Sequence, residues 1–223
     1  MKKFYINIIK RILDLIFSIL LLALLFPLFI IVSISIKLDS PGPVFFKQIR
    51  TGLNGKDFIL LKFRSMAEDN DIFDFERGDR ITKVGHIIRK ISLDEIPQLI
   101  NIFKGDMSFI GPRPWIKECY DYFIPYQKKR NLVKPGITGL AQISGRKDLN
   151  ILKRIDLDIE YVENIGFLLD IEIIAKTIVV VFNHSDNTHE NYTVEDEIRD
   201  LKDNYNLYFN ENVIEEDRQI FYE

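Results

Sequence analysis

The strongest hydrophobic pattern lies near the N-terminus. Residues 15–36 contain no charged side chain and are almost all leucine, isoleucine, valine, phenylalanine or alanine. As a helix, such a run can cross a bilayer, which takes about 20 residues. It is too long for the core of a signal peptide, and no small-x-small cleavage site precedes Lys37. The pattern predicts a membrane helix, with a buried helix of a soluble domain as the alternative.

Two features favour a helix that dips into the membrane and returns. Pro27 lies within the apolar run, where it removes a backbone hydrogen bond and kinks a helix. Lysine and arginine side chains flank the run on both sides, and positive flanks favour the cytoplasmic side of a membrane. We therefore predict a re-entrant helix within residues 1–37, broken at Pro27. A kinked helix that crosses the membrane is the alternative.

The rest of the chain mixes strand-like and helix-like patterns. Residues 44–49 and 58–63 are typical of short strands, and the loop between them contains Asn54 and Gly55, which indicates a hairpin. Apolar positions recur at helical intervals in residues 151–165 and 167–182. The second of these is apolar around most of its circumference, so it should pack or lie at a membrane interface. One more amphipathic helix is predicted after Thr193, a suitable N-cap.

These elements indicate an α+β, mainly helical protein in three parts. Residues 1–37 form the re-entrant membrane helix. Residues 38–182 form a small cytoplasmic catalytic domain with a short β-hairpin and interfacial amphipathic helices, and residues 183–223 form an acidic extension. An apolar content of 47% over 223 residues suffices for a core. The single cysteine, Cys119, excludes an internal disulfide and a cysteine-rich zinc site.

Charge is distributed unevenly along the chain. Residues 183–223 contain twelve acidic and three basic residues, which leaves the preceding 182 residues with 21 acids and 27 bases. A basic body beside a hydrophobic segment favours anionic lipid headgroups and phosphate-bearing substrates as partners. Nucleic acid is the competing explanation, but no zinc-finger, helix-turn-helix or base-stacking pattern supports it. We therefore expect a lipid bilayer and no nucleic acid among the partners.

One short stretch gathers the candidate chemistry. It contains Arg89, the adjacent acids Asp94 and Glu95, and a second arginine, Arg113, between two prolines. A carboxylate can attack phosphorus or hold a divalent cation, and guanidinium groups neutralise the phosphate oxygens that would repel such an attack. The stretch therefore predicts diphosphate chemistry. The alternative is structural, because Ser92 and Glu95 also match a helix capping box.

Neighbouring stretches extend this candidate site. Lys62 and Arg64 end the second strand and would add to a phosphate pocket, or else form a solvated strand edge. Residues 134–146 are rich in glycine, which lets backbone approach a nucleotide closely, although any tight loop would use it too. The aromatic and basic stretch after Pro114 suits either the headgroup region or a core-facing helix.

Together, four ordered motifs resemble the small monotopic phosphoglycosyl transferases, also called bacterial sugar transferases. The motifs are residues 37–66 (KLDSPGPVFFKQIRTGLNGKDFILLKFRSM), 79–99 (DRITKVGHIIRKISLDEIPQL), 107–114 (MSFIGPRP) and 134–146 (KPGITGLAQISGR). The resemblance covers about residues 8–182, and the order and separation of the motifs make it specific. The acidic extension lies beyond the minimal catalytic unit of the family.

The resemblance implies transfer of a phosphosugar from a UDP-sugar to undecaprenyl phosphate or another polyprenyl phosphate, with release of UMP and a need for Mg²⁺. It places the enzyme at the bacterial inner membrane, with its catalytic domain on the cytoplasmic face. Asp94 would be the nucleophile, would carry a covalent phosphosugar and would hold the metal. Glu95 would orient it or assist with metal and proton handling. The expected substrate-binding residues are Lys62, Arg64, Arg89, Pro112, Arg113, Pro114, Gln142 and Arg146.

The sequence departs from the family pattern at two positions. Phe26, rather than serine, precedes Pro27, and Trp115 follows the arginine motif where the family varies. Two other functions stay open: a catalytically silent membrane adaptor that binds lipid phosphates, and a magnesium-dependent hydrolase of nucleotide-sugar diphosphates. The sequence does not specify the sugar, the glycan pathway or the role of the extension. A homodimer and contacts with downstream glycosyltransferases also stay open.

Overall fold

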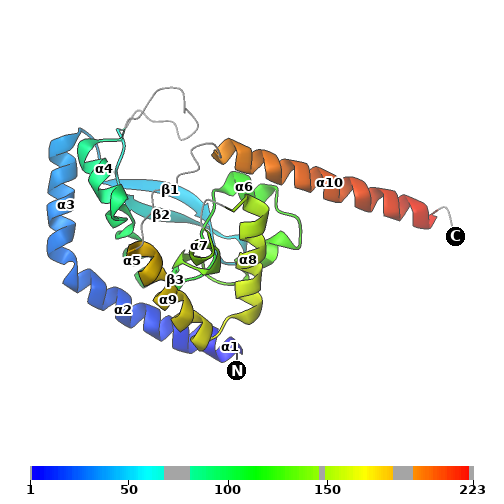
Figure 1. Cartoon of the computed structure of the whole chain (residues 1–223), viewed down its shortest axis with the longest axis horizontal. Helices are drawn as coiled ribbons and strands as arrows, with labels where there is room; N and C mark the ends of the chain where they lie inside the picture. Colours follow the sequence, from blue (N-terminus) through cyan, green and yellow to red (C-terminus); the bar gives the residue numbers. More distant parts are fainter. Residues whose placement is uncertain (1, 68–80, 146–148, 183–192, 221–223) are drawn as a thin grey trace.

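The computed structural model describes residues 2–67, 81–145, 149–182 and 193–220, and the described part is mainly helical (Figure 1). The helices are α1 (Lys2–Phe4), α2 (Lys10–Leu24), α3 (Phe26–Asp39), α4 (Lys83–Lys90), α5 (Gln98–Lys104), α6 (Lys117–Asp121), α7 (Leu140–Ile143), α8 (Ile151–Asn164), α9 (Phe167–Phe182) and α10 (Val194–Ile220). The strands are β1 (Phe45–Thr51), β2 (Asp57–Phe63), β3 (Ser108–Ile110) and β4 (Gly136–Thr138). Short helical turns are η1 (Tyr5–Ile9), η2 (Leu53–Gly55), η3 (Leu93–Glu95) and η4 (Gln127–Leu132).

The apolar N-terminal run folds as two helices with a bend of 61° between them. The break falls at Leu25, the residue between α2 and α3, and Pro27 is in the first turn of α3. Proline has no N–H to donate to the carbonyl of Ala23 four residues back, so the helix cannot continue regularly there. No side chain caps the start of α3. Among the described residues, no single helix is long and apolar enough to cross a membrane, but this bent pair is.

Both ends of the bent pair are attached to the same globular body. Near the start of α2, Arg11 donates to the carbonyls of Ile102 and Phe103, at 2.6 and 2.8 Å, and so caps the C-terminal end of α5. At the end of α3, the Asp39 carboxylate accepts a hydrogen bond from the backbone N–H of Val84 at 2.8 Å, at the start of α4. Figure 1 shows α2 and α3 wrapping one side of the molecule.

Buried polar contacts reinforce the α2 attachment. The Asp170 carboxylate on α9 receives the Lys10 ammonium at 2.6 Å and the hydroxyls of Tyr5 and Tyr161 at 2.6 and 2.7 Å. A buried charge is tolerated only when it is paired and hydrogen-bonded, which this carboxylate is. The Lys10 ammonium at the start of α2 is therefore bound to protein, and not left free to contact lipid headgroups.

The hairpin prediction is confirmed. Strands β1 and β2 are antiparallel, and their register pairs Thr51 with Asp57 next to the turn. Asn54 and Gly55 have φ values of 53° and 74°, a left-handed conformation that asparagine and glycine adopt most readily. The Asn101 side chain of α5 accepts from the N–H of Leu61 and donates to the carbonyl of Ile59, which holds α5 against the edge of β2.

The structure shows two features of the region after residue 105 that the sequence left open. The glycine-rich motif forms a strand, β4, which pairs in parallel with β3. Gly136 is required there, because a Cβ on it would lie 2.1 Å from the backbone nitrogen of Gly111. The aromatic stretch after Pro114 faces the protein core, since Trp115, Phe123 and Arg130 are buried. The headgroup interpretation of that stretch is therefore wrong for these three residues.

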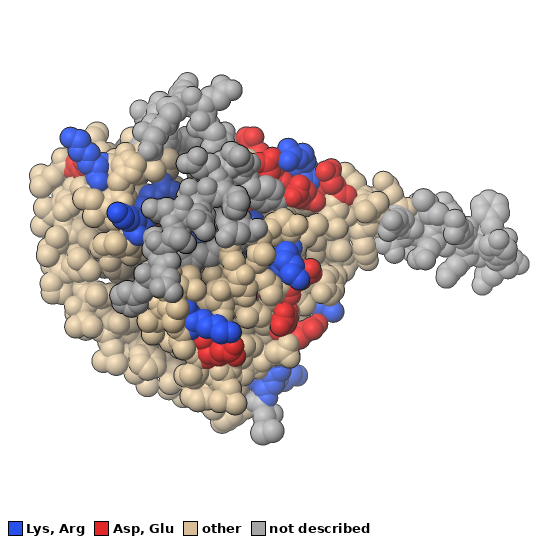
Figure 2. Space-filling view, viewed as in Figure 1, with Lys and Arg blue, Asp and Glu red and all other residues tan. Residues whose placement is uncertain are grey.

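The outer faces of α2, α3 and α9 are apolar and exposed. Figure 2 shows uncharged surface along the rim where α2 and α3 lie, with charged side chains at its two ends. Exposed apolar residues on the bent pair include Phe17, Leu20, Leu24, Phe26, Ile31 and Leu38. Exposed apolar residues on α9 include Phe167, Leu168, Ile174, Ile178 and Val179. Apolar patches of this extent mark interaction surfaces for membranes or proteins.

The C-terminal helix predicted from the apolar spacing is present as α10. Thr193 caps it, because its hydroxyl accepts from the N–H of Asp196 while the Asp196 carboxylate accepts from the N–H of Thr193. Leu201 is fully buried in a core cluster with Trp115 and Ile155. Beyond this contact the helix extends away from the body (Figure 1).

Candidate active site

The acid pair lies on η3, a short turn between α4 and α5. Ser92 has φ 56° and ψ 23°, a left-handed conformation that ends α4 and reverses the chain. Its side chain caps no helix, and α5 begins at Gln98 after Pro97. The capping-box interpretation is therefore wrong, because Glu95 turns away from Ser92 toward basic side chains from other parts of the chain.

Glu95 forms two ion pairs. Its Oε1 accepts from Lys62 Nζ at 2.8 Å, at the end of β2, and from Arg113 Nη2 at 2.9 Å. Burial alone would raise the pKa of Glu95, but Arg113 and Lys62 together lower it to about 2. This carboxylate stays ionised at any physiological pH, and it ties the strand end to the proline-flanked arginine.

Asp94 lies in a different environment from its neighbour. Its Oδ2 is 3.7 Å from Lys62 Nζ, and no described residue donates a hydrogen bond to it. Burial raises the pKa of Asp94 above the usual aspartate range, opposed chiefly by the Lys62 charge and more weakly by Arg89 and Arg113. Its side chain is 14% exposed. Within the described part of the chain, Asp94 is therefore a carboxylate with unused acceptor capacity beside a cation.

The backbone of the segment that carries Arg113 is held by Arg130, which forms a buried ion pair with Asp158. Arg130 donates from Nη2 to the Arg113 carbonyl at 2.6 Å and to the Asp158 carboxylate at 2.7 Å. The carbonyl of Pro112 accepts from the N–H of Gly136, the first residue of β4, at 3.0 Å. The Arg113 side chain itself is 45% exposed, so its backbone is held while its guanidinium stays accessible.

Sequence reasoning did not identify Arg50 as part of this region. Its Nη2 donates to Gln48 Oε1 at 2.5 Å and its Nη1 to the Pro114 carbonyl at 3.4 Å, while its Nε is buried without a partner among the described residues. Burial, and to a lesser extent repulsion from Arg113, lowers the pKa of Arg50 to about 10. The strand pattern gave no signal for this role, because it depends on contacts between distant segments.

Arg64, expected in the phosphate pocket, has another role. Its guanidinium donates to the carbonyls of Ser40, Pro41 and Pro43, at 2.9, 2.5 and 2.6 Å. It lies just past the end of β2, is buried, and holds the turn that follows α3. We correct its assignment from substrate binding to structure.

The glycine-rich motif contributes Gln142 near the Arg113 segment. Both polar atoms of the Gln142 side chain are buried and lack a hydrogen-bond partner within the described residues. A Cβ on Gly139 would lie 2.3 Å from the carbonyl oxygen of Gly111, so this loop lies directly against the start of the proline-flanked motif. Arg146, the remaining expected substrate-binding residue, lies outside the described residues.

The described residues include no group of three histidine, cysteine or acidic side chains that could hold a metal on its own. Magnesium, however, is commonly held by one or two carboxylates together with substrate phosphates. Asp94 fits that arrangement because its oxygens accept no hydrogen bond from the described residues, whereas Oε1 of Glu95 is engaged by two cations.

A family model described as bacterial sugar transferase matches residues 5–184. The chain belongs to the bacterial sugar transferase family. It is 43% identical over 177 residues to a Bacillus subtilis (strain 168) protein named uncharacterized sugar transferase EpsL, across 77% of this chain and 86% of that one. It is 42% identical over 181 residues to the UDP-glucose:undecaprenyl-phosphate glucose-1-phosphate transferase of Caulobacter vibrioides, across 76% and 68%.

A third relative is the UDP-N-acetylgalactosamine-undecaprenyl-phosphate N-acetylgalactosaminephosphotransferase of Aeromonas hydrophila, which is 41% identical over 182 residues. The match covers 76% of this chain but 43% of the Aeromonas protein. These findings confirm the resemblance drawn from the four motifs and the expectation of a phosphoglycosyl transferase enzyme. In this bacterial sugar transferase, α10 lies outside the residues that match the family model.

Proposed function

We propose that this bacterial sugar transferase moves a sugar 1-phosphate from a UDP-sugar to undecaprenyl phosphate, releasing UMP, through a covalent phosphosugar on Asp94. The observation that carries the proposal is that Asp94 lies beside Lys62 and accepts no hydrogen bond from any described residue. Its neighbour Glu95 is ionised at physiological pH and pairs with Lys62 and Arg113. The names of the relatives from Caulobacter and Aeromonas support the donor and acceptor classes.

In the proposed first step, an Asp94 oxygen attacks the β-phosphorus of the donor. The bond from that phosphorus to the bridging oxygen breaks, and UMP leaves with the bonding electrons. Like charge resists this attack, and the Lys62, Arg89 and Arg113 side chains supply the neutralisation. Glu95 orients Lys62 and Arg113 through its two ion pairs. In the second step, a phosphate oxygen of undecaprenyl phosphate attacks the same phosphorus and releases the Asp94 carboxylate.

We propose Mg²⁺ as the cofactor, held by Asp94 together with substrate phosphates. When bound, the ion would supply further positive charge to the phosphate oxygens. The protein residues keep the roles given above, since Lys62 and Arg113 are already fixed by Glu95. Gln142 and the backbone beside it would contact the donor, because their polar atoms lie next to the Arg113 segment and the side chain has no partner among the described residues.

The relatives are named for different sugars. The one named for glucose is 42% identical to this chain, and the one named for N-acetylgalactosamine is 41% identical. Overall identity therefore does not select the sugar. A relative named exopolysaccharide production protein ExoY, from Sinorhizobium fredii, is 39% identical over 197 residues and supports a role in surface glycan synthesis. A screen of UDP-sugars would identify which sugar the enzyme transfers.

The test is UMP release by the purified full chain in detergent or lipid nanodiscs, with a panel of UDP-sugars. We expect release that continues to completion only when undecaprenyl phosphate is added, because the second step needs a lipid acceptor. Release that continues without the acceptor would favour the hydrolase alternative. No release with any donor, under conditions in which the chain binds membranes, would favour the silent adaptor.

We further propose that the bent α2–α3 pair is re-entrant and that the catalytic domain lies on the cytoplasmic face of the bacterial inner membrane. Support comes from the attachment of both ends of the pair to one body, through Arg11 at α5 and Asp39 at α4. A helix that crosses a bilayer of about 30 Å would place those ends on opposite sides. The exposed apolar faces of α2, α3 and α9 supply the surface to bury in lipid.

Cysteine labelling would measure this topology. Lys3→Cys and Lys47→Cys place thiols at exposed positions on either side of the bent pair, and the native Cys119 is only 2% exposed, so it should label poorly. In intact spheroplasts we expect an impermeant maleimide to label neither position, and in permeabilised spheroplasts both. Labelling of Lys3→Cys alone in intact spheroplasts would instead show a crossing helix.

A further inference from the structure

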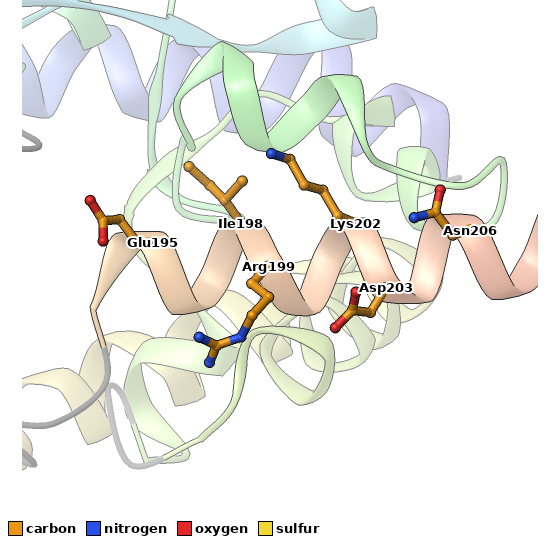
Figure 3. Close-up of a pocket in the computed structure, with 6 residues that line it drawn as sticks. All are labelled: Glu195, Ile198, Arg199, Lys202, Asp203 and Asn206. Atoms are coloured by element: carbon orange, nitrogen blue, oxygen red, sulfur yellow. The ribbon is translucent and has the colours of Figure 1, made fainter.

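The C-terminal helix α10 docks beside the Arg113 segment. It lies outside the residues that match the family model, which end at 184. Its Leu201 is fully buried, and Leu201 shares a core cluster with Trp115, the residue that follows Pro114. In Figure 3, Ile198 and Lys202 project from one side of the helix, and Arg199 and Asp203 project from the opposite side. The docked face is thus the one that includes Ile198 and Leu201.

The first turn of α10 places an acidic side chain at this contact. Glu197 forms an ion pair with Arg154 of α8, and both side chains are largely buried, at 21% and 15% exposure. The Arg154 guanidinium lies over the Trp115 ring, 5.5 Å from its centroid. A cation placed over an indole ring is held by the ring quadrupole. Glu197 therefore fixes the position of the cation that packs on Trp115.

Trp115 connects this contact to Arg113. A second guanidinium, that of Arg130, lies 4.6 Å from the Trp115 centroid, and the same group donates to the Arg113 carbonyl at 2.6 Å. The Trp115 carbonyl accepts from the N–H of Thr51 at the end of β1, at 3.0 Å. A shift of the Trp115 ring would therefore move the backbone that presents the Arg113 side chain.

The region around Trp115 also needs a negative charge. Arg50 and Arg154 each have a buried Nε without a partner in the described part of the chain. Arg130 is neutralised by Asp158, but Arg50 has no ion pair with any described residue, and the ion pair of Arg154 is with Glu197. Closely spaced guanidinium groups repel one another in a low-dielectric surrounding. Glu197 is thus the ion-pair partner of Arg154 in this cluster.

We propose that Glu197, carried by α10, is a positioning residue for Arg113: it clamps Arg154 on Trp115 and so holds the Arg113 segment in place for the donor diphosphate. This role rests on the proposed function. It gives the extension a task within the transfer reaction. The charged groups proposed to act on the phosphates stay within residues 62–113, and α10 acts through Trp115 and the backbone.

The test compares two glutamates in the first turn of α10. Glu197→Gln removes the ion pair, and Glu195→Gln removes an equal charge at an exposed position, so the effect on the helix dipole is matched. For Glu197→Gln we expect kcat for UMP release to fall about tenfold with little change in the donor KM, as for a contact needed only in the transition state. Glu195→Gln should stay within about twofold of wild type, and Glu197→Asp, which keeps the charge, should recover most of the loss.

Two further measurements separate positioning from stability. Leu201→Ala should lower Tm more than Glu197→Gln does, because it empties a buried site. If Glu197 only stabilised the fold, the measured kcat of Glu197→Gln would fall in proportion to the fraction of folded protein. At temperatures well below the Tm of each variant, its kcat would then equal that of wild type. Trp115 is the only tryptophan of the chain, so acrylamide quenching of its emission reads the contact without any activity assay. We expect stronger quenching in Glu197→Gln than in Glu195→Gln.

The outcomes are distinct. An active wild type together with a Glu197→Gln variant that keeps the wild-type kcat overturns the positioning role, whatever the quenching shows. A loss of kcat that is equal in both glutamine variants also overturns it, since the effect would then be one of helix charge. A wild type that releases no UMP from any UDP-sugar overturns the proposed function, and the positioning role with it.

Discussion

Replacing Asp94 with asparagine should abolish UMP release, with a loss of about 10⁴-fold or more, as expected when a covalent nucleophile is removed. The amide is nearly isosteric with the carboxylate but cannot attack phosphorus effectively at neutral pH. The fold should survive, because no described residue donates a hydrogen bond to the Asp94 carboxylate. Circular dichroism and membrane binding should match wild type.

The covalent intermediate can be sought directly. Incubation with the UDP-sugar donor alone should leave a phosphosugar on the enzyme, and trypsin cleavage after Lys90 and Lys104 would release it on the peptide of residues 91–104. That peptide contains one aspartate and one glutamate, Asp94 and Glu95. The modified peptide should be found in wild type and in Glu95→Gln, but not in Asp94→Asn. An adduct that persists in Asp94→Asn, or wild-type turnover by that variant, would exclude Asp94 as the nucleophile.

Glu95→Gln is the informative control, because the two acids differ in their surroundings. Glu95 is ion-paired with both Lys62 and Arg113 and has a pKa of about 2. It is therefore a poor candidate for the nucleophile, because it would have to leave both cations to reach the phosphorus. Its removal should slow the reaction by releasing Lys62 and Arg113, while leaving a nucleophile in place. Asp94, whose pKa is raised by burial, has no hydrogen bond to its oxygens from the described residues, which suits it better for attack.

The sequence predicted local elements well because their signals are local. The hairpin follows from alternation and an Asn-Gly turn, and α8, α9 and α10 follow from helical spacing with identifiable ends. Strands β3 and β4 have three residues each, too few to show a period, and they are held by pairing between residues 28 positions apart, such as Ser108 and Gly136. Such short elements depend on tertiary contacts that no local pattern reports.

The candidate site was predicted in part for the same reason. Motif order indicated Asp94, Glu95 and Arg113, but not that Glu95 would bind Lys62 and Arg113 together. Arg64 was misassigned because a basic residue at a strand end looks the same whether it faces a pocket or a set of carbonyls. The alternative interpretation of Ser92 and Glu95 as a capping box is wrong because such a box needs extended backbone at its first residue, and Ser92 is left-handed.

Lys62 should control both the rate and its pH dependence. Lys62→Met keeps the aliphatic stem but removes the cation that lies 3.7 Å from Asp94 and 2.8 Å from Glu95. We expect kcat/KM to fall about 10²-fold, the size of effect seen when one preorganised electrostatic contact is lost. Lys56→Met, at an exposed position in the hairpin connection, is the matched control and should leave kcat/KM unchanged.

The pH dependence of kcat/KM shows whether Lys62 tunes the pKa of Asp94 or acts directly on the substrate phosphates. Asp94 must be ionised to attack, so activity is full above its pKa and is lost as the pH falls through it. Burial has already raised that pKa, and Lys62 is the largest influence that lowers it. Removing the lysine therefore raises the pKa further, and the acidic limb of kcat/KM should move to higher pH in Lys62→Met but not in Lys62→Arg. A limb that stays in place while the rate falls would mean that Lys62 acts on the substrate phosphates and does not tune the nucleophile.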